Sequence, residues 1–123
     1  MHAKLHLEKK EEFLIAHLEG EIDNSVTKGY REKIDQLVLY DDYKYLILDF
    51  KDVSFVDSSG IGFIIGRYNL MKKEQGYIFL SGLNEFCMKI FKISGILRLI
   101  KSFEKTEDVI NEVKDNESYR VKI

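Results

Sequence analysis

The chain has 123 residues, with 19 lysine and arginine residues against 21 aspartate and glutamate residues, so its formal net charge is −2. This length fits one domain, and the balanced charge disfavours a protein that coats nucleic acid. A single cysteine, Cys87, excludes an intrachain disulfide framework and a four-cysteine zinc site. No signal-peptide pattern opens the chain, and its longest uncharged stretch is far below the ~20 residues of a membrane-spanning helix. We therefore expect a cytoplasmic protein without a membrane partner.

The first half of the chain predicts two strands, a helix and a further strand. Leu5 and Leu7 alternate with polar residues, and an apolar run follows over 13–18, as is typical of two strands joined by a turn. Asn24 or Ser25 can cap a helix that runs to about residue 39. The nearly continuous apolar run from 45 to 50 is typical of a central strand covered on both faces.

The second half predicts a helix, a short strand, another helix, an edge strand and a final helix. The expected ranges are 61–74, 77–80, 86–91, 97–103 and 106–113, the edge strand being marked by Leu97, Leu99 and Phe103. Strands that alternate with helices imply an α/β fold with a mixed, mostly parallel sheet of about four to five strands and about four helices. We take residues 1–115 as a single domain and expect residues 116–123 to form a frayed tail.

The polar residues do not form a recognisable catalytic or metal site. Ser58 lies between a strand and a helix, as a hydrolase nucleophile would, but its neighbours do not match Gly-x-Ser-x-Gly. No histidine follows His17, so Ser58 has no candidate general base in the order that such a fold requires. His2, His6 and His17 lie in the first two expected strands without acidic or cysteine partners at metal-ligand spacing. We therefore expect neither catalysis nor a metal.

Three glycines, Gly60, Gly62 and Gly66, open the helix that follows residue 59. Glycines at a strand–helix junction can bind phosphate. The dinucleotide-binding fingerprint is Gly-x-Gly-x-x-Gly, however, and here three residues instead of two separate the second glycine from the third. We interpret Gly62 and Gly66, one turn apart, as positions where the helix lies close against the sheet. A small nucleotide- or anion-binding module that uses Gly60 and Gly62 remains an alternative.

Asp57, Ser58 and Ser59 stand in a row at the start of the same helix. Each is a favoured N-cap, but one cap is enough for one helix. A serine at an exposed helix N-terminus is also a suitable phosphate acceptor, because the helix dipole tolerates the added negative charge. The row therefore leaves two interpretations open, a helix cap or a phosphorylation site.

Several segments resemble the STAS domain of anti-sigma factor antagonists. They are Gly-Glu-Ile-Asp at 20–23, Leu-Ile-Leu-Asp-Phe at 46–50, Asp-Ser-Ser-Gly-Ile-Gly at 57–62 with Gly-Arg-Tyr at 66–68, and Ile-Ser-Gly-Ile at 93–96. The resemblance covers about residues 3–115 in order and is strongest with the sporulation members of the family. It implies a STAS fold and a regulatory role rather than an enzymatic one.

This resemblance implies a partner-switching cycle. The unphosphorylated form would bind an anti-sigma factor that is also a serine kinase and so release a sigma factor, in the sporulation members sigma F. The kinase would phosphorylate Ser58, and a serine phosphatase would restore the active form. The resemblance places the other partner-binding residues at Glu21, Asp23, Asp57, Ser59, Ile61 and Gly62. Direct binding of ATP or GTP is possible but not expected, and the general-stress antagonists of the same family are the alternative.

The expected fold gives this arrangement a physical basis. Loops that follow neighbouring parallel strands emerge at the same end of a sheet, so Glu21, Asp23 and Asp57 would form an acidic rim around Ser58. Such a rim suits a partner with a basic docking face, because complementary charges speed encounter.

Overall fold

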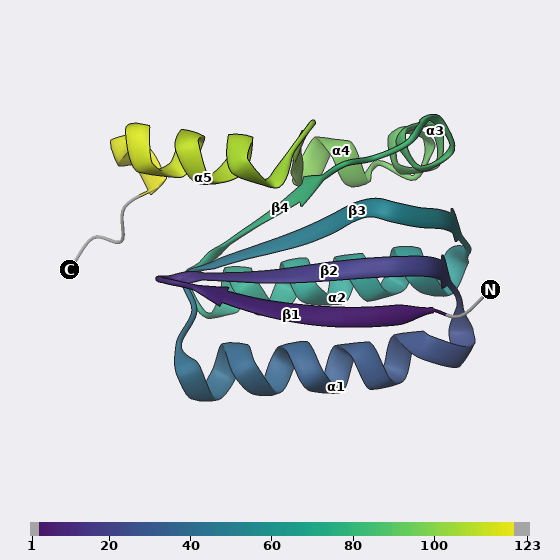
Figure 1. Ribbon diagram of the computed structural model, residues 1–123, viewed down its shortest axis with the longest axis horizontal. Coiled ribbons are helices and arrows are strands. Elements are labelled where there is room, and N and C mark those ends of the chain that lie inside the picture. The colour runs from purple at the N-terminus through teal and green to yellow at the C-terminus, as the bar shows by residue number, and fades with distance from the viewer. Residues whose placement is uncertain (1–2, 120–123) are drawn as a thin grey trace.

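The computed structural model describes residues 3–119 and shows one five-stranded sheet in the order β1-β2-β3-β4-β5 (Figure 1). The strands are β1 (Lys4–Lys10), β2 (Phe13–Ile22), β3 (Tyr45–Val56), β4 (Tyr77–Ser81) and β5 (Lys101–Phe103). β1 is antiparallel to β2, whereas the other three neighbouring pairs are parallel. The expected mixed, mostly parallel sheet is therefore confirmed.

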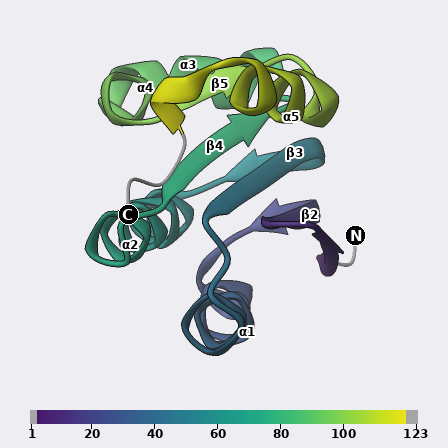
Figure 2. The ribbon, with the colours of Figure 1, turned by 90° about the vertical axis from the view of Figure 1, so that its left-hand side faces the viewer.

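Helices cover both faces of the sheet. They are α1 (Asn24–Asp41), α2 (Ser58–Lys73), α3 (Glu85–Ile93), α4 (Ile96–Leu99) and α5 (Thr106–Asp115), so the described part of the chain has five α-helices where about four were expected. α1 and α2 lie together on one face, and α5 lies on the other (Figure 2). None of the helices between residues 3 and 119 is long and apolar enough to span a lipid bilayer.

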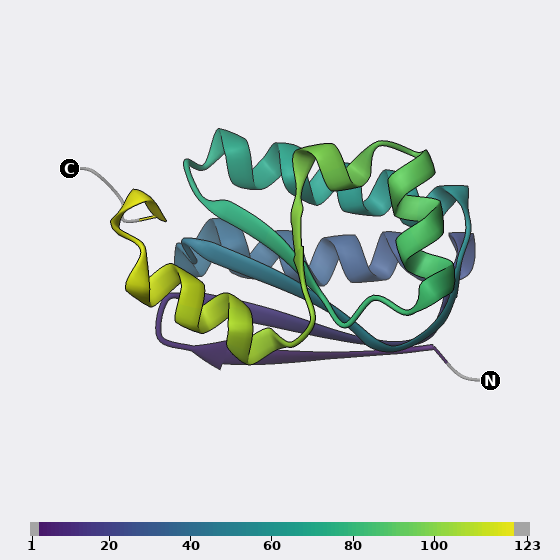
Figure 3. The same ribbon diagram turned by 90° about the horizontal axis from the view of Figure 1, so that it is seen from above.

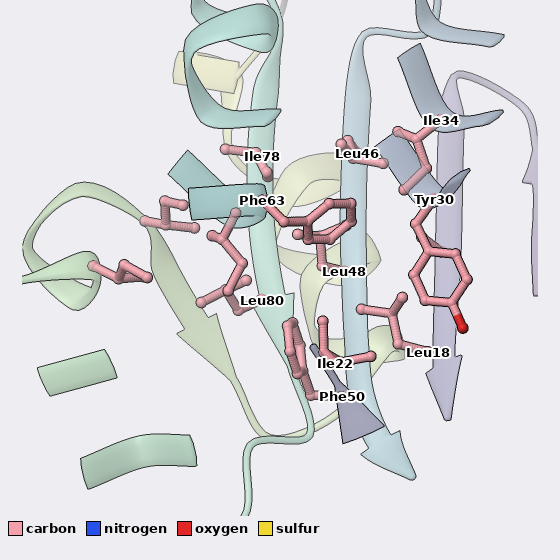
Figure 4. Packing of buried hydrophobic residues seen from close by; sticks show 14 of the residues in the cluster. Leu18, Ile22, Tyr30, Ile34, Leu46, Leu48, Phe50, Phe63, Ile78 and Leu80 are labelled. Atoms are coloured by element: carbon pink, nitrogen blue, oxygen red, sulfur yellow. The ribbon is translucent and has the colours of Figure 1, made fainter. Parts of the chain in front are cut away.

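The larger core lies between the sheet and the pair α1 and α2. Leu46, Leu48 and Phe50 alternate along β3 and are fully buried against Ile34 of α1 and Phe63 of α2 (Figure 4). This alternation places every second residue of a strand on the same face. The same core holds Cys87 of α3, and its burial raises the pKa of the thiol to about 11. Cys87 is therefore a core residue rather than a reactive thiol.

The smaller core lies on the opposite face, under α5. Phe13, Tyr45 and Phe79 of the sheet pack against Val109 and Val113 of α5.

The end of the described chain also packs on this face. The short 3-10 helix η1 (Glu117–Tyr119) places the Tyr119 ring 5.2 Å from that of Tyr77, edge to face. The Tyr45 hydroxyl donates a hydrogen bond of 2.7 Å to the Tyr119 carbonyl. These contacts hold residues 117–119 in place, which differs from the expected frayed tail, and residues 120–123 lie outside the described part.

Three local expectations were wrong. α1 is capped by Asp23 rather than Asn24 or Ser25, because only Asp23 has the extended backbone of an N-cap. β3 continues to residue 56 because its second half still pairs with β2 across two register shifts. Leu97 and Leu99 lie in α4 and not in the edge strand, since Gly95 turns the chain with φ +87° and directs Ile96 into the core.

Candidate functional site

The candidate residues gather at one end of the sheet, where two parallel strands lead into two helices. β2 ends at Ile22 and is followed by Asp23, the N-cap of α1. β3 ends at Val56 and is followed by Asp57, the N-cap of α2. The two loops are joined by a hydrogen bond, which the Asp57 amide donates to the Ile22 carbonyl at 3.3 Å. Figure 1 shows the N-terminal ends of both helices at the same side of the molecule.

The carboxylate of Asp57 organises the first turn of α2. One of its oxygens accepts hydrogen bonds from the Ser59 amide at 2.9 Å, the Gly60 amide at 3.2 Å and the Ser59 hydroxyl. These bonds, that of the Ser59 hydroxyl first, hold the pKa of Asp57 below its usual value of 3.8. Asp57 is therefore a negatively charged helix cap at neutral pH.

The two serines of this turn differ in exposure and in the hydrogen bonding of their hydroxyls. Ser59 is half-buried, and its hydroxyl donates to Asp57. Ser58 is exposed as the first residue of α2, and its hydroxyl forms no hydrogen bond with any residue from 3 to 119. The geometry thus leaves Ser58 as the hydroxyl of this turn that an external enzyme can reach.

The acidic residues of the expected rim share this end but have different roles. Asp23 is half-buried, and its carboxylate accepts a hydrogen bond of 2.9 Å from the Ser25 amide. Glu21 is exposed near the end of β2 and has no ion-pair partner among the described residues. Two of the three acids therefore cap helices, and Glu21 is the one whose carboxylate is fully available to a partner.

The glycines of α2 do not act as the sequence suggested. A Cβ on Gly60 would lie 2.5 Å from Cγ1 of Val56 and 3.0 Å from the Ile22 carbonyl oxygen, whereas one on Gly62 or Gly66 would meet nothing within 4 Å. Gly60 is thus the position where α2 comes close to the sheet, and the interpretation of Gly62 and Gly66 was wrong. Gly62 lies one turn and Gly66 two turns beyond the start of α2.

Gly62 and Gly66 instead line a cleft of about 390 Å³ between the first turns of α1 and α2. Lys28 and Arg31 of α1 lie on its other wall. Gly62 is exposed and Ile61 is half-buried, so both reach the surface beside Ser59. The structure therefore brings Glu21, Asp23 and the 57–62 segment to one end of the molecule.

Two polar networks were not predicted from the sequence. Arg67 of α2 is buried and pairs with Asp35 of α1, with Nε 2.7 Å from Oδ1. On the opposite face of the sheet, His17 lies 2.8 Å from Glu8 and 2.7 Å from Asp49. Both networks join residues far apart in the chain, and nothing in the local sequence marks them.

Two carboxylate neighbours favour the protonated form of the His17 ring. Burial favours the neutral ring, but the hydrogen bonds to Glu8 and Asp49 outweigh it and raise the pKa of His17 above its usual 6.5. Between residues 3 and 119 no group of three or more His, Cys, Asp or Glu side chains could hold a metal ion. His2 lies outside the described residues.

The fold and this site together define an α/β fold in which the N-terminus of α2 presents a free serine hydroxyl beside an acidic residue. The chain belongs to the STAS domain family, whose model matches residues 4–109.

Curated relatives match nearly the whole chain. It is 25% identical over 114 residues to the "Anti-sigma F factor antagonist" of Paenibacillus polymyxa, covering 93% of this chain and 97% of the relative. It is 30% identical over 107 residues to the "Anti-sigma-B factor antagonist" of Bacillus subtilis, covering 87% and 96%.

Solved structures agree with these relatives. The anti-sigma factor antagonist SpoIIAA in its unphosphorylated form superposes with a TM-score of 0.82 at 26% identity, covering 92% of this chain and 98% of that one. The phosphorylated form of SpoIIAA from Bacillus superposes with a TM-score of 0.73 at 27% identity, covering 89% and 99%. The expected STAS fold is confirmed.

Proposed function

We propose that this protein is an anti-sigma factor antagonist that acts by binding rather than by catalysis. Its unphosphorylated form binds an anti-sigma factor that is also a serine kinase, and so releases a sigma factor, sporulation sigma F. Phosphorylation of Ser58 ends the binding, and a serine phosphatase restores it. The observation that carries the proposal is the free, exposed Ser58 hydroxyl in a chain that aligns almost end to end with antagonists.

The position of Ser58 explains how one phosphate could act as a switch. The group adds about −1.5 to −2 charges at neutral pH, and the N-terminus of α2 tolerates them in the free protein. In a packed interface beside Glu21 and Asp57, the same charge would be desolvated next to other negative charges. An uncompensated buried charge costs about 3–5 kcal/mol, and each 1.4 kcal/mol is tenfold in affinity.

The residues around Ser58 have different roles at this surface. Glu21 offers a free carboxylate to a basic group of the partner, while Asp23 and Asp57 set the first turns of α1 and α2. Ile61 and Gly62 complete the contact surface around Ser59. The SpoIIAA structures exist in unphosphorylated and phosphorylated forms, which supports the same cycle here.

The phosphorylation step is tested with the purified anti-sigma kinase, ATP and intact-mass spectrometry. We expect one added phosphate on the wild-type chain, one on Ser59→Ala and none on Ser58→Ala. Ser59→Ala is the matched control, because it removes the adjacent hydroxyl of the same turn. Phosphate that persists on Ser58→Ala would sink the assignment.

The binding step is tested by isothermal calorimetry with the same anti-sigma factor. We expect Ser58→Ala to bind like the unphosphorylated wild type and Ser58→Asp to bind at least about tenfold more weakly. Incubation of the phosphorylated protein with a serine phosphatase should restore both the mass and the affinity of the starting protein. Equal affinity of Ser58→Asp and wild type would contradict the proposed switch.

A general-stress antagonist is the second candidate. The observation that favours it is the 30% identity to the "Anti-sigma-B factor antagonist" of Bacillus subtilis, against 25% to the "Anti-sigma F factor antagonist" of Paenibacillus polymyxa. Parallel calorimetric titrations against an anti-sigma F factor and an anti-sigma-B factor separate the two. Tighter binding of the anti-sigma-B factor would replace the sporulation assignment with the stress one.

A further inference from the structure

Two aromatic side chains are stacked on the surface at the same end of the molecule as Ser58. The rings of Phe55, in β3, and Phe86, in α3, lie 5.4 Å apart between centroids with an angle of 25° between their planes. Phe55 is 41% exposed and Phe86 is 39% exposed. The two stacked rings form an exposed apolar patch, which we call the Phe55–Phe86 patch. Single exposed apolar residues are ordinary, but grouped ones on a soluble domain mark contact sites.

The anchoring of α3 does not depend on this patch. Asn84 caps the helix by accepting from the Cys87 amide at 2.8 Å and also donates to the Val53 carbonyl at 2.9 Å. Cys87 and Phe91 are fully buried in the larger core. These contacts hold α3 against the sheet, so Phe86 is left at the surface for another use.

The patch is continuous with the surface proposed to bind the anti-sigma factor. Phe55 is paired in register with Glu21 on the neighbouring strand β2, and in-register residues of parallel strands lie side by side. Phe55 also comes three residues before Ser58 in the chain. Figures 1 and 3 both show α3 at the end of the sheet where α1 and α2 begin.

The charges around the patch indicate the chemistry of its partner. Glu21 is the register partner of Phe55, and Glu85 directly precedes Phe86 in α3. Both glutamates are exposed, and neither has an ion pair within residues 3–119. Protein interfaces commonly combine a central apolar cluster, enriched in aromatic residues, with a polar rim. The patch and its two glutamates have this composition.

We propose that Phe55 and Phe86 are the apolar anchor of the docking surface for the anti-sigma factor. The partner would place an apolar side chain against the two rings and a basic group toward Glu21. This inference rests on the proposed function and adds the apolar half of the contact to its acidic half.

The test is calorimetric titration of the anti-sigma factor into Phe55→Ala, Phe86→Ala and the double variant. The matched control is Tyr40→Ala, because Tyr40 is an aromatic residue that is 81% exposed near the opposite end of α1. We expect the double variant to bind about 30-fold more weakly, as at interface hot spots, and Tyr40→Ala to match the wild type. Thermal melts of each variant show whether it is folded. If the double variant does not fold, the binding comparison is made with Phe86→Ala alone.

The outcomes separate this inference from the proposed function. Weakening by both Ser58→Asp and the Phe55–Phe86 variants supports both. If Ser58→Asp binds more weakly but the folded Phe55–Phe86 variants keep wild-type affinity, the apolar anchor is overturned and the antagonist function still stands. An equal loss in Tyr40→Ala also overturns the anchor, because the effect would not be local to the patch. No binding by the wild-type chain rejects the proposed function and the anchor with it.

Discussion

Arg67 and Asp35 form an ion pair that joins α2 to α1 beneath the cleft beside the candidate site. Arg67 Nε lies 2.7 Å from Asp35 Oδ1, and Nη2 donates to Oδ2 at 3.0 Å. The Arg67 side chain is 5% exposed, and it also donates from Nη1 to the Phe63 carbonyl at 3.3 Å. Because both helix N-termini carry candidate residues, the pair helps to fix their relative position.

Loss of one partner of this pair should destabilise the protein strongly. Asp35→Asn leaves the buried guanidinium without its counter-charge, and we expect about 3 kcal/mol less free energy of unfolding. Urea denaturation measures this. A double-mutant cycle consists of the single variants Arg67→Met and Asp35→Leu and the variant that combines them. We expect the double variant to be more stable than the sum of the two single losses implies. Strict additivity would show that the two residues act independently.

The cap of α2 gives a second prediction. Asp57→Ala removes the acceptor for two backbone amides and should cost about 1 kcal/mol of stability at neutral pH. Asp57→Asn is the control that keeps a capping oxygen without the charge, and it should lose less.

This loss should also depend on pH. Because folding lowers the pKa of Asp57 below 3.8, its charge stabilises the protein above that pH, and the contribution is lost as the pH falls through the lowered value. The difference in unfolding free energy between wild type and Asp57→Asn should therefore shrink as the pH falls below about 4. A constant difference across this range would contradict the role of the charge.

The strongly periodic elements were predictable from the sequence, and their boundaries were not. The apolar run at the start of β3 and the helical spacing in α1 are local signals, and both appear in the structure. The second half of β3 contains exposed Lys51 and Asp52 and is held by pairing with β2, which no local pattern shows. Leu97 and Leu99 show the alternation typical of a strand, but in the structure they lie in a helix that buries Ile96.

The candidate site shows the same division between local and tertiary information. The position of Ser58 after a strand and at the start of a helix followed from sequence alone. The sequence did not show which of the two serine hydroxyls is free. The Ser59 hydroxyl donates a hydrogen bond to Asp57, and only the geometry of the folded turn reveals this bond. The contacts of His17 involve residues 9 and 32 positions away, so only the sheet brings them together.

His17 gives a third prediction, with the opposite pH dependence. Its pKa is raised above 6.5 in the folded state, so its ion pairs with Glu8 and Asp49 contribute fully below about pH 6.5 and fade as the pH rises through the raised value. His17→Gln should cost about 1 kcal/mol of unfolding free energy at pH 6 and less at pH 8.5.

The control for His17→Gln is His6→Gln, because His6 is stacked 5.8 Å from His17 and has no ion pair among the described residues. His6→Gln should show no such change between the two pH values. Urea denaturation at both pH values measures the effect. A larger cost of His17→Gln at pH 8.5 than at pH 6 would reverse the sign and refute the assignment.

The glycines of α2 give the last prediction, in which alanine at two positions should distinguish a glycine packed against the sheet from one with open space around it. In Gly60→Ala, the new methyl would meet Cγ1 of Val56 and the Ile22 carbonyl, so α2 must shift, at about 1–3 kcal/mol. In Gly62→Ala, the methyl meets nothing within 4 Å, and the stronger helix propensity of alanine should add about 0.5–1 kcal/mol. Urea denaturation of the two variants should thus give changes of opposite sign, and changes of equal sign would show that Gly60 is not where α2 contacts the sheet. If Gly62 also lies in the docking surface, Gly62→Ala should weaken binding of the anti-sigma factor in calorimetry while the protein itself becomes more stable.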